Sequence, residues 1–105
     1  MVKKGTSFTK PTYCLDSIKV EFDRVESLRM TGIANRSIAE LDFTLQDVVD
    51  CIQGLEDNNF YKTMAPYTKG FTANHDVYKI NYLEIDLYIK FQKVKNFFIV
   101  SFKEE

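Results

Sequence analysis

The stretch "LEIDLYIKFQKVKNFFIVSFKEE", residues 83–105, decides the fold of this chain. Its first half alternates apolar and polar side chains strictly, which predicts a strand with one buried face. Its second half resumes the alternation directly after Lys95 and Asn96. If these two residues form a hairpin loop, Phe91 lies opposite Val100 on the neighbouring strand. The stretch therefore predicts a β-hairpin with a defined register.

This register gives the hairpin one apolar and one polar face, and a shift by one residue would scramble both. The apolar face is predicted to contain Leu83, Ile85, Leu87, Ile89, Phe91, Phe98, Val100 and Phe102. The polar face is predicted to contain Tyr88, Lys90, Ile99, Ser101 and Lys103. Tyr88 then lies directly across from Lys103.

Two more strands are predicted upstream, at "FYKTM" (60–64) and "HDVYKI" (75–80). Lys62 and Met64 share one face of the first. Pro66 is expected to end that strand, because proline cannot donate to a sheet ladder.

The N-terminal half has the period of helices instead. One apolar stripe at three- and four-residue spacing comprises Leu15, Ile18, Phe22 and Val25. The segment "SLRM" (27–30) is either a short strand or an interruption before a second short helix at "ANRSIAEL" (34–41).

A further helix is predicted within "DFTLQDVVDCIQGL" (42–55), with Thr44 as N-cap, Asp47 near its positive end and Gly54 at its end. One face is predicted to contain Leu45, Val48, Val49, Ile52 and Leu55. The fold class is therefore α+β: a single domain over 1–105, with N-terminal helices packed on the apolar face of a mainly antiparallel sheet.

Charge is unevenly distributed along the 105 residues, although the net charge is only −1. Residues 1–15 contain three lysines and no acid, residues 16–59 contain ten acids against four bases, and residues 60–105 contain seven lysines against five acids. The weak net charge argues against a general nucleic-acid coat. The C-terminal part also contains most of the aromatic residues, and aromatic plus cationic side chains suit both single-stranded RNA binding and an ordinary sheet.

The cysteines, Cys14 and Cys51, form no CxxC pair, and the chain has one histidine, which argues against a Cys/His zinc site. Two reduced, mostly buried thiols in a cytoplasmic protein are expected. We also expect no cofactor, no membrane span and no secretory signal.

The predicted polar face offers lysines, tyrosines and a histidine, without paired carboxylates or a glycine-rich phosphate loop. Such a set can act on an RNA phosphodiester without metal, because RNA carries its own nucleophile, the 2′-hydroxyl. Side chains need only transfer protons and stabilise the charge that develops on the phosphorane oxygens.

Five stretches carry a family resemblance: "LDFTLQDVVDCIQGL" (41–55), "NNFYKTM" (58–64), "HDVYK" (75–79), "LYIKF" (87–91) and "FFIVSFKEE" (97–105). Together they resemble the MqsR (motility quorum-sensing regulator) toxins of bacterial type II toxin–antitoxin modules, which have the RelE-like fold. FYKxM and VSFKE at this separation are more specific than either motif alone.

The resemblance implies a ribosome-independent mRNA endonuclease, an mRNA interferase, that cuts at short GC-containing sites without metal. It also implies a cognate antitoxin of the MqsA type, which itself binds zinc and DNA and holds the toxin inactive. The expected partners are therefore mRNA and this antitoxin, with DNA association only through the antitoxin.

The resemblance also assigns residues. The family's lysine in FYKxM falls on Lys62, its glutamine before DVY on His75, its tyrosine in LYVK on Tyr88 and its lysine in SFKE on Lys103. The catalytic candidates are thus Lys62, His75, Tyr88 and Lys103. The substrate-binding candidates are Tyr61, Met64 and Lys90. The family's Trp-Gln pair is replaced here by Asn74 and His75, and its aspartate before FYK by Asn59.

Tyr61 and Met64 are either stacking residues or core residues, and Lys90 and Lys79 are at most contacts to backbone phosphates. Each catalytic candidate also has an ordinary structural interpretation. Lys62 is either a solvated strand lysine or a phosphate contact, and His75 either a surface residue or a proton-transfer or base-contact group. Tyr88 can simply pack on Lys103, which can be a gatekeeper charge near the C-terminus. At the level of the whole chain, the alternative is a non-catalytic α+β protein that pairs with an antitoxin or RNA.

Overall fold

The computed structural model describes residues 7–8, 10–64 and 74–105, so Pro66 lies outside the described residues. Its helices are α1 (Leu15–Glu21), α2 (Gly32–Leu41) and α3 (Leu45–Gln53), with 3₁₀ turns at Val25–Ser27 and Asp57–Asn59. Its strands are β1 (Ser7–Phe8), β2 (Phe60–Met64), β3 (His75–Tyr82), β4 (Ile85–Val94) and β5 (Phe97–Glu104).

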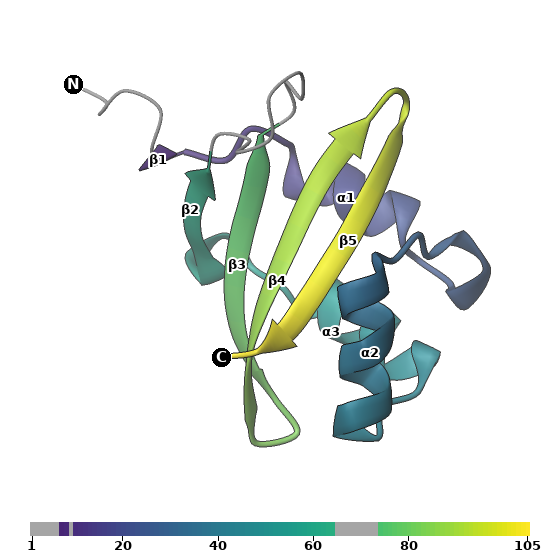
Figure 1. The fold of residues 1–105 in the computed structure, drawn as a ribbon. Helices are drawn as coiled ribbons and strands as arrows, with labels where there is room; N and C mark the ends of the chain where they lie inside the picture. The colour runs from purple at the N-terminus through teal and green to yellow at the C-terminus, as the bar shows by residue number, and fades with distance from the viewer. Residues whose placement is uncertain (1–6, 9, 65–73) are drawn as a thin grey trace.

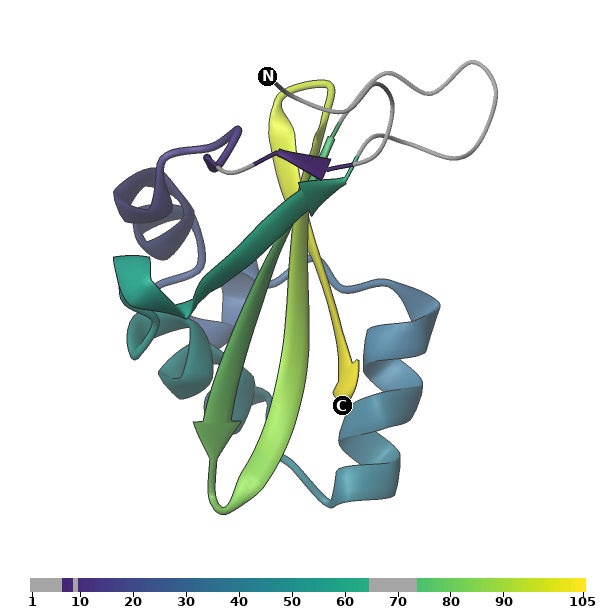
Figure 2. The same ribbon diagram turned by 90° about the vertical axis from the view of Figure 1, so that its left-hand side faces the viewer.

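The strands form one sheet in the order β1-β2-β3-β4-β5, and every neighbouring pair is antiparallel (Figure 1). Helices α1 and α3 cover one face, called here the inner face, whereas α2 lies alongside β5 and away from them (Figure 2). The α+β prediction is confirmed. The two-residue strand β1 was not predicted. None of the helices in the described part of the chain has the length and apolar character needed to cross a membrane.

The β4–β5 hairpin has the predicted register. Phe91 pairs with Val100, and Tyr88 pairs with Lys103. The buried residues of its inner face are Leu87, Ile89, Phe91, Phe98, Val100 and Phe102. The opposite face, called here the outer face, carries the polar row of the hairpin.

The prediction for Leu83 is wrong. Strand β4 begins at Ile85, and Leu83 and Glu84 form the tight turn from β3, with φ angles of 51° and 67°. A two-residue hairpin turn requires such positive φ values to match the twist of the strands. Leu83 is consequently 62% exposed. The alternation of apolar and polar residues continues through this turn. It therefore did not reveal that the chain reverses direction between β3 and β4.

Helix α3 begins and ends as predicted. The Thr44 side chain accepts a hydrogen bond from the Asp47 N–H, while the Asp47 carboxylate accepts one from the Thr44 N–H, which makes a capping box. Gly54 is the C-cap. Leu45, however, is exposed rather than buried, because a residue in the first turn points back beyond the packed part of the helix.

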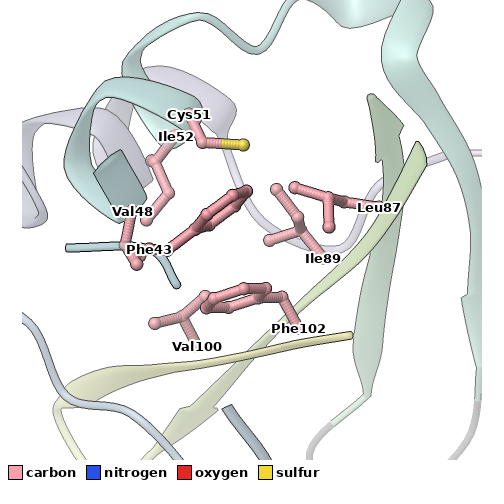
Figure 3. A pocket seen from close by; sticks show the side chains of 8 residues that line it. All are labelled: Phe43, Val48, Cys51, Ile52, Leu87, Ile89, Val100 and Phe102. Atoms are coloured by element: carbon pink, nitrogen blue, oxygen red, sulfur yellow. The ribbon is translucent and has the colours of Figure 1, made fainter. Parts of the chain in front are cut away.

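Side chains from α3 interlock with the inner face of the sheet in the core (Figure 3). The helix contributes Val48, Cys51 and Ile52. They surround a gap of only about 10 Å³ together with Phe43, Leu87, Ile89, Val100 and Phe102. This gap is a packing defect in an apolar core rather than a ligand site.

The predictions for the apolar stripe of residues 15–25 and for the segment 27–30 are met in part. Leu15 and Ile18 of α1 and Phe22 directly after it are buried, whereas Val25 lies further on in a 3₁₀ turn and is half-buried. Residues 27–30 interrupt the helices and make one parallel bridge, from Met30 to Val100.

Asp76 is fully buried and joins three segments. The Thr12 N–H donates to its Oδ1 at 2.9 Å and the Tyr13 N–H to its Oδ2 at 2.8 Å. The Thr63 hydroxyl donates to Oδ1 at 2.6 Å. Burying a carboxylate is costly unless it is fully hydrogen-bonded, so these donors make the burial tolerable. The carboxylate thereby ties the segment before α1 to β2 and β3.

Replacing Asp76 by alanine is expected to lower the free energy of unfolding by about 3 kcal/mol, because three donors lose their acceptor. Urea denaturation followed by circular dichroism measures this change. The matched control is Asp86→Ala, an exposed aspartate on β4, which is expected to change the free energy by less than about 0.5 kcal/mol. Equal effects for the two substitutions would contradict the role given to Asp76.

The cysteines differ from the expectation of two mostly buried thiols, because Cys14 is exposed and only Cys51 is buried. Burial raises the pKa of the Cys51 thiol to about 12. Hydrogen bonds from the Ser17 backbone and side chain, and from the Asp16 backbone, lower the pKa of Cys14. Cys14 is the N-cap residue, directly before the first residue of α1.

In the native protein, iodoacetamide at mildly alkaline pH is therefore expected to alkylate Cys14 and to leave Cys51 unmodified, since the thiolate is the reactive form. Mass spectrometry of peptides from the labelled protein measures this. The same reaction in urea, where both thiols are expected to react, is the control. Modification of Cys51 at a rate similar to Cys14 in the native state would contradict the packing of α3.

Candidate functional site

A β-bulge in β2 sets the direction of Lys62. Phe60 pairs with Tyr78 and Lys62 pairs with Val77, so Tyr61 is an extra residue between two paired positions. Without the bulge, strict alternation would place Lys62 on the same face as Phe60, which packs on the inner core. The extra residue turns Lys62 to the outer face.

Three rows of residues consequently cross the outer face. In one row Lys62 pairs with Val77, which pairs with Lys90, which pairs with Ser101. On one side of it lies the row Met64, His75, Gln92 and Ile99. On the other side lies the row Lys79, Tyr88 and Lys103.

Six of these residues line a hollow of about 260 Å³, called here the basic hollow. They are Lys62, Met64, Val77, Tyr88, Lys90 and Lys103. Val77 is almost completely buried although it lies on the outer face, because the larger side chains around it cover it. The structure therefore brings together Lys62, Tyr88 and Lys103 from three different strands.

The three ammonium groups of the basic hollow affect each other. Burial lowers the pKa of Lys90, and the charges of Lys103 and Lys62 lower it further. A like-charge cluster that is partly removed from water is unfavourable in the free protein. An anion in the basic hollow would relieve this repulsion, so the site is suited to a phosphate.

Tyr61 stands at the margin of the basic hollow. Its ring centroid lies 6.0 Å from that of Tyr88, and the Lys79 ammonium lies 4.1 Å from the Tyr61 centroid and 5.1 Å from the Tyr88 centroid. Lys79 also makes a 3.1 Å ion pair with Glu105, which raises the Lys79 pKa. Sequence reasoning gave Lys79 little weight, yet its pairing with Tyr88 on β4 is the signal that could have found it.

Tyr61 is 46% exposed, so its ring is accessible to a ligand rather than part of the core. Met64, which was open between a core and a ligand-facing position, lines the basic hollow and is half-buried. Both side chains are therefore available for contacts with a bound molecule.

His75 does not line the basic hollow. It lies in an adjoining depression of about 200 Å³, called here the side groove, whose lining includes Thr31, Ile33, His75, Lys90, Gln92 and Ile99. Lys90 borders both depressions. Burial and the charge of Lys90 lower the pKa of His75, whereas a hydrogen bond with the Gln92 side chain raises it. The net direction is downward, so the imidazole is neutral at pH 7.

Helix α2 contributes to the side groove through Thr31 and Ile33, which sequence reasoning did not connect with the site. The connection depends on the segment before α2. The Arg29 carbonyl accepts from the Val100 N–H at 2.8 Å, and the Thr31 N–H donates to the Val100 carbonyl at 3.1 Å. These bonds fix the start of α2 beside β5. No local sequence pattern encodes this long-range placement.

Among the described residues, no group of three His, Cys, Asp or Glu side chains is arranged to bind a metal ion. The groups available at the outer face are thus ammonium, phenol, imidazole and amide groups. They can bind an anion and transfer protons.

Comparison with known proteins identifies the family. A family model described as motility quorum-sensing regulator, toxin of MqsA, matches residues 10–104, which is nearly the whole chain. The chain belongs to this family. A curated relative, the mRNA interferase toxin MqsR of Escherichia coli (strain K12), is 32% identical over 78 residues, which cover 74% of this chain and 79% of the relative. Membership of the MqsR family and the name of this relative support the expected endoribonuclease class.

The lowered pKa of His75 can be measured directly, because the chain has a single histidine and hence one set of imidazole resonances in a proton NMR spectrum. The titration midpoint is expected below 6.5 in the unmodified protein. Lys90→Met removes the charge and retains the bulk, so the midpoint is expected to rise.

The control for this titration is Lys93→Met, which removes an exposed lysine from the other side of the same strand. Its midpoint should match that of the unmodified protein. A midpoint above 6.5, or no response to Lys90→Met, would contradict the surroundings described for His75.

Proposed function

We propose that this MqsR-family protein is a ribosome-independent toxin that cuts mRNA without a metal ion. The observation that carries the proposal is the convergence of Lys62, Lys90 and Lys103 with Tyr88 on one hollow of the outer face. Family membership and the mRNA interferase relative support the same activity. Cleavage at short GC-containing sites, a cytoplasmic location and inhibition by an MqsA-type antitoxin are parts of the proposal, with DNA association only through that antitoxin.

The proposed reaction is an internal transfer of the phosphoryl group. The 2′-oxygen of the substrate attacks the adjacent phosphorus and loses its proton, and the bond from phosphorus to the 5′-oxygen breaks. The 5′-oxygen gains a proton. The products carry a 2′,3′-cyclic phosphate and a 5′-hydroxyl, and neither water nor metal enters the step.

The lysines would stabilise the charge that builds up on the non-bridging oxygens. Lys62, Lys90 and Lys103 line the basic hollow from β2, β4 and β5 respectively. Their mutual repulsion is already present in the free protein, which is the preorganisation that electrostatic catalysis requires. Binding of the phosphate anion then reduces the repulsion among the three ammonium groups.

Tyr88 and His75 are the proposed proton-transfer groups. Tyr88 lines the basic hollow beside the three lysines, and its phenol is proposed to donate or accept a proton there. His75 is neutral at pH 7 and one row away, so it can accept a proton or contact a base. Tyr61 and Met64 are proposed to contact a splayed base of the bound RNA by stacking.

The proposal is tested with purified protein and a defined transcript in the presence of EDTA. Unmodified protein is expected to produce fragments with 5′-hydroxyl ends, which are mapped by sequencing after phosphorylation with a kinase. Lys62→Met is expected to lower the cleavage rate by about 10²–10³-fold, since it removes one preorganised charge from the transition state.

Lys19→Met is the matched control, because it removes the same charge from α1 on the inner side of the sheet. It should cut at the rate of the unmodified protein. If the unmodified protein does not cut, and its expression does not arrest growth, the enzyme proposal fails and a non-catalytic partner of an antitoxin or RNA is the better description.

A further inference from the structure

We propose that the side groove is a specificity subsite that binds the nucleobase next to the scissile phosphate. This inference rests on the proposed function, since it takes the phosphate to lie in the basic hollow. It adds Thr31, Ile33, Gln92, Ile99 and Ser101, all of which line the side groove. Thr31 and Ile33 stand at the start of α2, Gln92 on β4, and Ile99 and Ser101 on β5, and the family resemblance assigned a role to none of them.

The walls of the side groove suit a planar, apolar ring. Ile33 projects from the first turn of α2 and is 58% exposed, and Ile99 faces it from β5. The exposed isoleucine is not used in the core, although α2 buries other side chains against β5. A base inserted between Ile33 and Ile99 would cover this exposed apolar surface, which stabilises binding.

The rim of the side groove offers hydrogen-bonding groups that can distinguish bases. The Thr31 hydroxyl accepts from the Ala34 N–H and donates to the Ser101 hydroxyl at 2.9 Å, so Ser101 retains its own proton to donate. The Gln92 amide hydrogen-bonds the His75 imidazole, and an amide has more donor and acceptor sites than that one bond uses. Amide side chains paired with a base edge discriminate strongly among bases.

The spacing fits one nucleotide step. The row containing His75 and Gln92 is two residues along the strands from the row containing Val77 and Lys90. Two residues of a strand span roughly 7 Å, which is comparable to the separation of a phosphate from the base of its neighbour. Lys90 borders both depressions, so one ribonucleotide can reach from one to the other.

A base fits the side groove better than a second phosphate does. Lys90 is its only permanently charged lining residue among those described, and that lysine already faces the basic hollow. His75 is neutral, and two isoleucines would desolvate an anion without compensating for the loss. The volume of about 200 Å³ corresponds to roughly seven water molecules at ~30 Å³ each, the size range of a one-ring base.

The test uses two sets of four short RNAs. Within a set, the RNAs differ only in the identity of one base next to the cut. The first set is cleavable and gives rates in EDTA. The second has 2′-deoxyribose at the cut, so it gives dissociation constants by fluorescence anisotropy without reaction. Both sets are measured with the unmodified protein, with Ile33→Ala and with Gln92→Leu. Val20→Ala, 74% exposed on α1, is the control.

Unmodified protein and Val20→Ala are expected to prefer one base on one side of the cut in both sets. Ile33→Ala and Gln92→Leu are expected to reduce that preference by about tenfold, mainly through the preferred base. Thermal denaturation verifies that both variants are folded, and two different substitutions guard against an effect peculiar to one of them.

The inference is overturned if the variants lower all four rates equally, or if base preference is unchanged. It is also overturned if the uncleavable set binds without base preference. If the unmodified protein discriminates among the uncleavable RNAs through Ile33 and Gln92 but does not cut the cleavable set, the proposed function fails and the base subsite stands.

Discussion

The buried carboxylate of Asp76 is the constraint on which the arrangement of both faces depends. It draws Thr63 of β2 and the backbone of Thr12 and Tyr13 to the inner face. Because side chains alternate along a strand, fixing Asp76 inward fixes His75 and Val77 outward. The same interaction anchors the chain just before α1, so the helical layer and the outer face are positioned by one group. An apolar residue here would fill the space without specifying the path of the N-terminal segment.

The bulge at Tyr61 allows β2 to pack Phe60 and Thr63 against the core and still direct Lys62 to the outer face. Phe60 and Thr63 must both point inward, Phe60 to reach Tyr78 and Thr63 to reach Asp76. These two positions are three apart along the chain, an odd spacing that strict alternation would place on opposite faces. The bulge absorbs the odd residue and leaves Tyr61 and Lys62 both directed to the outer side, beside Tyr88. A charged residue and an aromatic residue thus share the margin of one hollow.

Much of the fold could be predicted from the sequence, because its strongest signals are local. Thr44 and Gly54 mark the ends of α3, and the alternation after Asn96 fixes the hairpin register. The same period misled at Leu83, where a turn without glycine or asparagine preserves the alternation of polarity. At the site, the alternation of apolar and polar residues was enough to predict that Tyr88 lies opposite Lys103. The hollow that they share with Lys62 depends on the order of the strands in the sheet, which alternation does not reveal. Thr31 and Ile33 could not be connected with that site, since their positions follow from backbone bonds to Val100.

The slight negative charge of the whole chain does not conflict with an anion site, because the charges are separated by the sheet. The acids of α1 and α3 lie on the inner side, whereas the basic hollow opens on the outer side. At physiological ionic strength, charges further apart than about 8 Å are largely screened from each other. A phosphate at the outer face therefore responds mainly to Lys62, Lys90 and Lys103. Their close grouping, rather than the net charge, sets the local field. The placement of three lysines by register and bulge is thus the physical reason that an acidic protein can present a site for a polyanion.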